Sequence, residues 1–140
     1  MLPAADNLLK NTFGKSDKLK SSLEIEALYR ENKYIVAFPL KCYYSFSEIS
    51  EHKSNLRVAF TVPKKTFKLA TDRNTIKRRM REAYRLHYKK IFETFLHQKE
   101  LQLKLFFIYV GKEIPEYRDI EKNILTILQK IPPVFHSNME

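Results

Sequence analysis

One run of residues, Leu101 to Val110, places the strongest constraint on the fold of this chain. Successive side chains of a β-strand point to opposite faces, and in this run both alternating sets are largely apolar. This pattern is typical of a strand that is buried within a sheet. The sequence therefore predicts a buried strand here. The two sets are Leu103, Leu105, Phe107 and Tyr109 on one face, and Phe106 and Ile108 on the other.

Helical periodicity occurs in three other segments. A short first helix is expected over about residues 21–32, and a longer second helix over about residues 73–96. A last helix is expected from about Ile120 to Ile131, where Pro132 and Pro133 should end it. The second helix is expected to bury one stripe of side chains, which consists of Ile76, Met80, Ala83, Tyr84, His87 and Ile91.

Two further segments are rich in aromatic and β-branched residues, as strands are. In residues 34–46, Pro39 interrupts the run, which predicts either two strand pieces or an edge strand with a bend. Residues 56–62, which end before Pro63, have the length and composition of a central or near-central strand. The predicted order of elements is therefore α-β-β-β-α-β-α, and the predicted fold class is α+β.

The size of the chain fits one domain. With 140 residues, of which 44% are hydrophobic, it can build a single core. We expect an irregular N-terminal arm at residues 1–12, the folded domain at 13–131 and a C-terminal tail at 132–140. No apolar run reaches the roughly 18 residues that span a bilayer, and no signal peptide is evident, so we expect a cytoplasmic protein without a membrane partner. Cys42, the single cysteine, is expected in the core, and no metal-ligand spacing is present.

The charge of the chain is concentrated in one segment. The net charge is +10, and residues 57–90 contain twelve Lys and Arg but only two acids, Asp72 and Glu82. The rest of the chain has equal numbers of basic and acidic residues, so this segment carries the whole excess. Like charges repel, and concentrating them lowers stability unless a polyanion neutralises them. We therefore favour a polyanionic partner over a merely solvated surface.

Several of these cations fall on one face of the second predicted helix. At about 100° per residue, an arc measured from Arg73 and lying beside the apolar stripe contains Asn74, Lys77, Arg78, Arg81 and Arg85. Arg79 lies on another face. The arc lacks the alternating signs of a helix surface held by ion pairs. Guanidinium groups can fork onto phosphate oxygens, lysine acts as a point charge, and Asn74 can bond to a sugar or base edge. The predicted RNA-binding residues are Lys64, Lys65 and Lys68 in the preceding loop and Arg73, Asn74, Lys77, Arg78, Arg81 and Arg85 on the helix.

The same residues resemble the signature of a known family. Residues 57–65, RVAFTVPKK, precede Lys68 and Ala70, and the helix then reads Arg-Asn-x-x-Lys-Arg-x-x-Arg-Glu-x-x-Arg from Arg73 to Arg85. This pattern resembles that of the ribonuclease P protein subunit, and a weaker resemblance covers about residues 13–130. The resemblance implies a single-domain α-β sandwich with a four-stranded sheet and a left-handed β-α-β crossover, as in a domain of a small-subunit ribosomal protein.

The resemblance also implies a function. The family's holoenzyme is an endonuclease that removes the 5′ leader of precursor tRNA, and its catalytic centre belongs to an RNA subunit. The expected partners are that RNA subunit and precursor tRNA, with Mg²⁺ bound by the two RNAs rather than by the protein, and no small-molecule substrate. Tyr29 and Tyr44 are candidates for stacking on leader bases, in a groove between the sheet and the motif helix. The alternative is that both are core tyrosines.

No catalytic residues are predicted in the protein itself. The paired acids Glu24 with Glu26, and Asp119 with Glu121, fit a solvated helix face, and no nucleophile, phosphate-loop or zinc pattern is present. A non-enzymatic protein that binds structured RNA, of ribosomal or RNA-chaperone type, would use the same basic helix and stays an alternative. A DNA-binding helix-turn-helix protein is disfavoured because residues 56–62, just before the basic helix, predict a strand.

Overall fold

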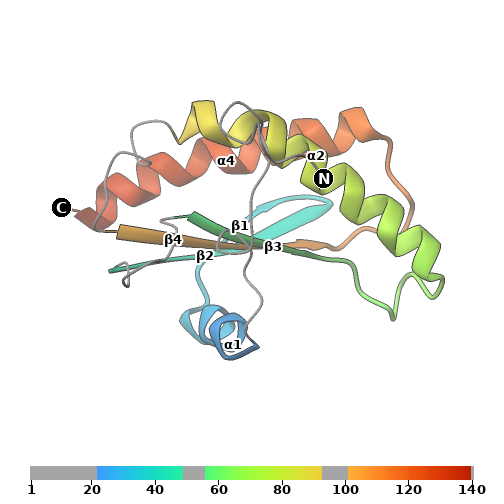
Figure 1. Cartoon of the computed structure of the whole chain (residues 1–140), viewed down its shortest axis with the longest axis horizontal. Coiled ribbons are helices and arrows are strands. Elements are labelled where there is room, and N and C mark those ends of the chain that lie inside the picture. The colour runs from blue at the N-terminus through green and yellow to red at the C-terminus, as the bar shows by residue number, and fades with distance from the viewer. Residues whose placement is uncertain (1–21, 49–55, 93–100, 140) are drawn as a thin grey trace, which may run out of the picture.

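The structure, a computed structural model, describes residues 22–48, 56–92 and 101–139. In Figure 1 a sheet separates two layers of helix, with α2 and α4 along one face and α1 against the other. The order of elements is the predicted α-β-β-β-α-β-α. The elements are α1 (Ser22–Glu31), β1 (Tyr34–Ala37), β2 (Leu40–Glu48), β3 (Leu56–Thr61), α2 (Ala70–Ile91), β4 (Leu101–Tyr109) and α4 (Tyr117–Met139).

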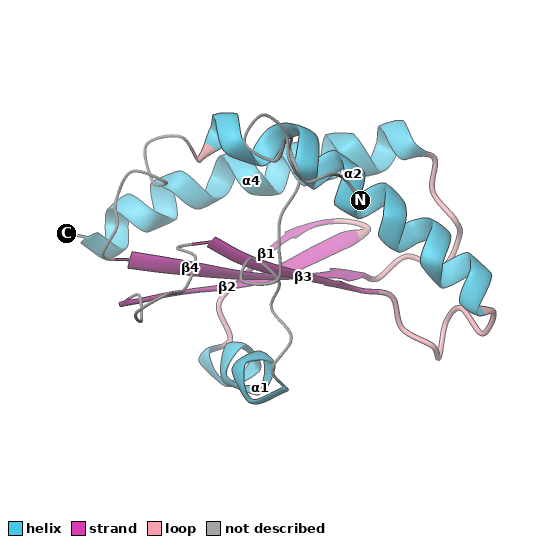
Figure 2. Ribbon diagram, viewed as in Figure 1, coloured by secondary structure: helices cyan, strands magenta, loops and turns pink. Residues whose placement is uncertain are grey.

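The sheet has four strands in the order β1-β2-β4-β3. The pairs β1 with β2 and β2 with β4 are antiparallel, whereas β3 and β4 are parallel neighbours that α2 connects. β4 is therefore an interior strand, as predicted, and it is covered on both faces, because Leu105 is buried on the α2 side and Phe106 on the α1 side. Figure 2 shows the strands between the two helical layers, and this α+β architecture confirms the predicted fold class.

The prediction that residues 56–62 form a central or near-central strand is wrong. Among the described strands, β3 pairs with β4 alone and lies at the edge of the sheet. Its apolar composition reflects the face that it turns toward α2, where Leu56 and Val58 are buried. The other face carries Arg57 and Thr61, which are partly exposed. A strand with one apolar face does not need an interior position.

Residues 34–46 form two strand pieces, which confirms one of the two alternatives. β1 and β2 make an antiparallel hairpin, with Phe38 and Pro39 at the turn and a cis peptide bond between them. Pro39 sits outside the ladder, where its missing N–H breaks no strand pairing. Its carbonyl accepts a hydrogen bond from the N–H of Val110 at 2.8 Å, so the turn is held to the end of β4.

The side chains of the sheet alternate between two cores. The larger core lies between the sheet and the α2 and α4 layer, and Cys42 is fully buried in it, as expected. The smaller core contains Leu28 of α1, Tyr43 of β2 and Phe106 of β4. Because neighbours along a strand point to opposite faces, Tyr43 belongs to the smaller core and Tyr44 to the larger one.

α2 differs from its predicted form at its ends and at one buried position. It begins at Ala70 and ends at Ile91, and the predicted continuation over residues 93–96 lies outside the described residues. The predicted stripe lies in the core or packs against it, except at His87, whose place Tyr88 takes. His87 turns toward α4, where its Nε2 lies 2.7 Å from Oε2 of Glu121. The ring of Tyr88 instead stacks on that of Tyr84, with centroids 4.7 Å apart.

The last helix does not end at Pro132 and Pro133. α4 continues to Met139, so the prediction that these prolines end the helix is wrong. A proline inside a helix removes one backbone hydrogen bond and crowds the carbonyl four residues earlier, which disfavours the helix without excluding it. The tail predicted at residues 132–140 stays a prediction. The predicted arm at residues 1–12 lies outside the described residues. Among the helices of the described part, none has the length and hydropathy that a membrane span requires.

Candidate RNA-binding surfaces

The connection between β3 and α2 presents three lysines. Phe67, in the middle of this loop, is buried in the larger core. Its N–H donates to the carbonyl of Pro63 at 3.1 Å, which closes a turn. Lys64, Lys65 and Lys68 are exposed around this anchor. The buried ring of Phe67 therefore anchors the backbone of the loop from which the three exposed lysines project.

Arg73 supports the same loop from the first turns of α2. Its Nη1 donates to the carbonyl of Phe67 at 2.7 Å and to that of Lys68 at 3.1 Å. The N-cap residue of the helix, Leu69, provides no side-chain hydrogen bond. The two hydrogen bonds from Arg73 connect the loop to the helix by another route. Both contacts use one terminal nitrogen, and the guanidinium has further N–H groups with which to bind a phosphate.

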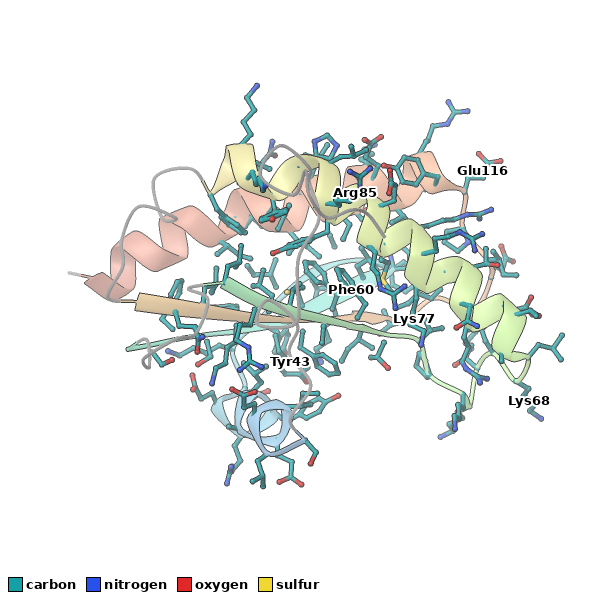
Figure 3. All side chains as sticks on the ribbon, in the orientation of Figure 1. Tyr43, Phe60, Lys68, Lys77, Arg85 and Glu116 are labelled. Carbon is teal, nitrogen blue, oxygen red and sulfur yellow. The ribbon has the colours of Figure 1, made fainter. Side chains whose placement is uncertain are left out.

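The helix continues this cationic surface. In the described ranges, 22–48, 56–92 and 101–139, no carboxylate lies within ion-pair distance of Lys77, Arg78 or Arg81. The buried stripe of α2 fixes the side from which they project, and Figure 3 shows nitrogen-tipped side chains along α2 and the loop that carries Lys68. We call the full predicted set the basic face, which consists of Lys64, Lys65, Lys68, Arg73, Asn74, Lys77, Arg78, Arg81 and Arg85.

Besides Arg73, two further arginines of α2 make contacts within the protein. Arg85 donates to both carboxylate oxygens of Glu82, with Nε···Oε1 at 3.1 Å and Nη2···Oε2 at 2.6 Å. These hydrogen bonds lower the pKa of Glu82 and raise the pKa of Arg85, so both side chains are charged at neutral pH. Arg79 donates to the carbonyl of Pro115, just before α4. Its exclusion from the basic face agrees with the helical periodicity.

A second surface lies on the face of the sheet that α1 covers. The strand register aligns Tyr34 of β1, Tyr43 of β2 and Phe106 of β4 in one row across the sheet, which we call the aromatic row. Tyr29 of α1 packs edge-on against Tyr43 and Phe106, with ring centroids 4.8 and 5.8 Å apart. Tyr29 and Tyr34 remain 46% and 45% exposed. Nζ of Lys41 lies 4.2 Å from the centroid of the Tyr34 ring, so a cation accompanies the exposed aromatic side chains.

The predicted groove between the sheet and α2 is not present. Core side chains fill that space, and among them Phe60 stacks on Phe107 with centroids 5.3 Å apart. Tyr44 is 9% exposed and packs against Phe46 in the same core, which favours the alternative that it is a core tyrosine. Tyr29 lies on the opposite face of the sheet. One groove cannot contain both tyrosines, and Tyr29 stays a candidate by itself.

A shared carboxylate ties α1 to the sheet. Oε2 of Glu24 accepts a hydrogen bond from Nη1 of Arg57 on β3 at 2.7 Å, and it lies 3.2 Å from Nζ of Lys104 on β4. The three side chains are between 12% and 20% exposed. Near the end of α1, Ser45 of β2 donates to Glu31 at 2.9 Å. The prediction that Glu24 belongs to a solvated acidic face is therefore wrong, because it fixes the position of the helix that carries Tyr29.

Both surfaces present groups suited to binding RNA. The basic face offers cations for phosphate oxygens, and the α1 side of the sheet offers partly exposed aromatic rings for bases. Within the described residues, no group of three or more His, Cys, Asp or Glu side chains is arranged to hold a metal ion. An α+β domain with these two adjoining surfaces has the form of a nucleic-acid-binding protein.

Comparison with known proteins identifies the family. The family model described as Ribonuclease P matches residues 13–131. Because that match covers most of the sequence, the chain belongs to the ribonuclease P protein family. It is the protein subunit of the endonuclease that removes the 5′ leader of precursor tRNA, an enzyme whose catalytic centre lies in its RNA subunit.

Relatives and solved structures agree with this assignment. The ribonuclease P protein component of Porphyromonas gingivalis is 34% identical over 128 residues, which cover 86% of this chain and 91% of the relative. That of Chlorobium phaeobacteroides is 28% identical over 129 residues, with 86% and 88% covered. The RNase P protein structure from Staphylococcus aureus has a TM-score of 0.64 at 19% identity, over 84% of this chain and 96% of that one. This likeness shows that the fold is shared.

Proposed function

We propose that the basic face binds the phosphate backbones of the ribonuclease P RNA subunit and of precursor tRNA, and that these RNAs hold the Mg²⁺ needed for cleavage. The row of Lys77, Arg78 and Arg81, which has no acidic partner among the described residues, carries this proposal. Such a row is unfavourable in isolation and favourable beside phosphates. Fixed cations also reduce the repulsion between two RNAs, so the holoenzyme should need less Mg²⁺ than the RNA subunit alone.

The 5′ leader is proposed to lie on the α1 side of the sheet. Beside the aromatic row, the register aligns Lys41, Ile108 and Thr61 in a second row, and Thr61 is the last residue of β3 before the lysine loop. A single strand on this face would meet Tyr29 and Tyr34 as rings for its bases and lysines for its phosphates. Stacking contributes about 1–3 kcal/mol per base with little sequence preference, which suits a subunit that meets many different leaders.

Cleavage of precursor tRNA by a bacterial ribonuclease P RNA transcript tests the first part. At a Mg²⁺ concentration where the transcript alone is slow, the protein should restore cleavage, and RNA-free protein should cleave nothing. Lys77→Ala should weaken binding to the transcript and reduce the salt-dependence slope by about one unit or less. Lys130→Ala, at an exposed position of α4, removes the same charge away from the basic face and should change neither. Cleavage by RNA-free protein, or equal effects of the two variants, would overturn the proposal.

Affinity for precursor tRNA relative to mature tRNA tests the second part, measured with the reconstituted holoenzyme. Tyr29→Ala should lower this ratio by about five-fold or more, the equivalent of one lost base stack. Leu23→Ala is the matched control, since Leu23 is a 73% exposed apolar residue of the same helix. An unchanged ratio for folded Tyr29→Ala would remove the leader from this face and leave the first part of the proposal standing.

A further inference from the structure

Glu82 is an acidic residue that lies in the sequence between two cations of the basic face, Arg81 and Arg85. It lies on α2 directly after Arg81 and accepts hydrogen bonds from the guanidinium of Arg85 with both of its oxygens. Arg78 is one helical turn before Glu82, yet the described structure shows no ion pair between them. The carboxylate of Glu82 thus pairs with Arg85, which follows it in the helix. Among the described residues, Arg78 and Arg81, which precede it, have no acidic partner.

The Glu82–Arg85 pair has a supporting neighbour. Tyr117, the first residue of α4, is close enough to both side chains for their charges to act on its hydroxyl, and burial is the main cause that raises the pKa of Tyr117. The guanidinium of Arg85 is 31% exposed and the carboxylate of Glu82 is 46% exposed. The guanidinium of Arg85 is therefore partly shielded from water and is held by both oxygens of the Glu82 carboxylate.

From this geometry we infer that Glu82 sets the C-terminal limit of the RNA-binding surface, by holding Arg85 in an internal ion pair and so withholding it from phosphate. The inference rests on the proposed function of the basic face. It adds that Glu82 determines how far along α2 the RNA-contacting residues extend. In the free protein, the cations of the basic face that are available to RNA then end at Arg81. Arg85 is thus the exception within the basic face: it falls on the same arc of the helix, but its ion pair with Glu82 lets it contribute little to RNA affinity.

The strength of the pair decides what its removal would do. A partly exposed pair three residues apart on a helix shifts an equilibrium by about a factor of two. A phosphate that competes for Arg85 must overcome that factor and the repulsion from the Glu82 carboxylate. Without the carboxylate, Arg85 would make one further phosphate contact, which steepens the dependence of log Kd on log salt by up to about one unit.

A double-mutant comparison tests the inference, with a ribonuclease P RNA transcript as the probe and binding measured over a series of salt concentrations. Glu82→Gln keeps the shape and helix propensity of the side chain, and it should tighten binding at least two-fold and steepen the salt dependence. Arg85→Ala alone should change the salt dependence little. In the Arg85→Ala background, Glu82→Gln should no longer steepen it, because no guanidinium is released.

Asp72→Asn is the charge control. It removes one acid from the first turn of α2, where the described residues show no ion pair to break. Relief of simple repulsion should tighten binding in this variant without steepening the salt dependence. Equal slopes for Glu82→Gln and the wild-type protein, or equal steepening with and without Arg85, would overturn the inference. The proposed function fails separately, if Lys77→Ala binds the transcript as tightly as the wild-type protein does.

Discussion

Replacing Glu24 by Gln tests whether the shared carboxylate holds α1 on the sheet. Glu24 is the acid that both Arg57 and Lys104 approach, at 2.7 and 3.2 Å, and the three side chains are mostly shielded from water. The substitution keeps the size of the side chain and removes its charge. Two cations then remain close together in a place where solvation is poor, so the folded state should lose stability.

The expected magnitude follows from the exposure of the three groups. Removing one partner of a fully buried ion pair costs about 3–5 kcal/mol. Here the side chains are 12–20% exposed, so water recovers part of that loss, and about 2 kcal/mol is expected. For a chain of this size, that loss lowers the melting temperature by about 5–10 °C.

Urea unfolding followed by far-ultraviolet circular dichroism measures this loss, and Glu26→Gln provides the control. Glu26 is exposed on the same helix, so its substitution removes the same charge without disturbing the contact to the sheet. We expect a lower midpoint for Glu24→Gln and an unchanged midpoint for Glu26→Gln. If the two variants unfold at the same urea concentration, the Glu24 contacts are no stronger than a solvated surface pair and do not hold α1.

Three further predictions concern the rest of the domain. Gly111→Ala should cost about 1–3 kcal/mol in thermal unfolding, because an added Cβ would lie 2.6 Å from the hydroxyl of Tyr109, which is itself bonded to the carbonyl of Glu113. The Cys42 thiol should resist a thiol reagent at pH 8 until the protein is unfolded, because burial raises its pKa and keeps it protonated. Arg79→Ala should lower thermal stability through the lost contact to Pro115 and leave RNA affinity unchanged, and a loss of affinity would refute the assignment of Arg79 to the α4 side.

The local pattern of the sequence predicted the elements and their order, and long-range pairing decided the rest. Helical periodicity placed the helical residues of the basic face on one side of α2 and excluded Arg79, because the direction of a helical side chain depends on its position in the helix. The edge position of β3 depends on which strand pairs with β4, and strand composition does not encode that choice. The contact between Glu24 and Arg57 joins residues that are 33 positions apart, so no local spacing could indicate it.

The burial of Tyr44 follows from the alternation along β2. Tyr43 and Tyr44 are adjacent in this strand, so their side chains point to opposite faces of the sheet. Tyr44 shares its face with the apolar side chains of Leu40, Cys42 and Phe46, and Tyr43 shares its face with Lys41, Ser45 and Ser47. The strand's own pattern therefore indicates that Tyr44 faces the larger core, and the stacking role predicted for Tyr44 did not take this alternation into account.

The edge position of β3 explains how one small domain can offer RNA two adjoining surfaces. β3 contributes Thr61 to the partly exposed side of the sheet, and the chain then passes directly into the lysine loop and α2. An edge strand lets this connection leave the sheet without crossing a neighbouring strand, and residues 62–69 link the strand at the border of the sheet to the helix that carries the basic face. The geometry between them depends on the burial of Phe67 and on the contacts from Arg73 to the loop carbonyls. In the proposed function, Arg73 therefore has two tasks: its guanidinium binds a phosphate, and its contacts to the carbonyls of Phe67 and Lys68 hold the loop between the sheet and α2.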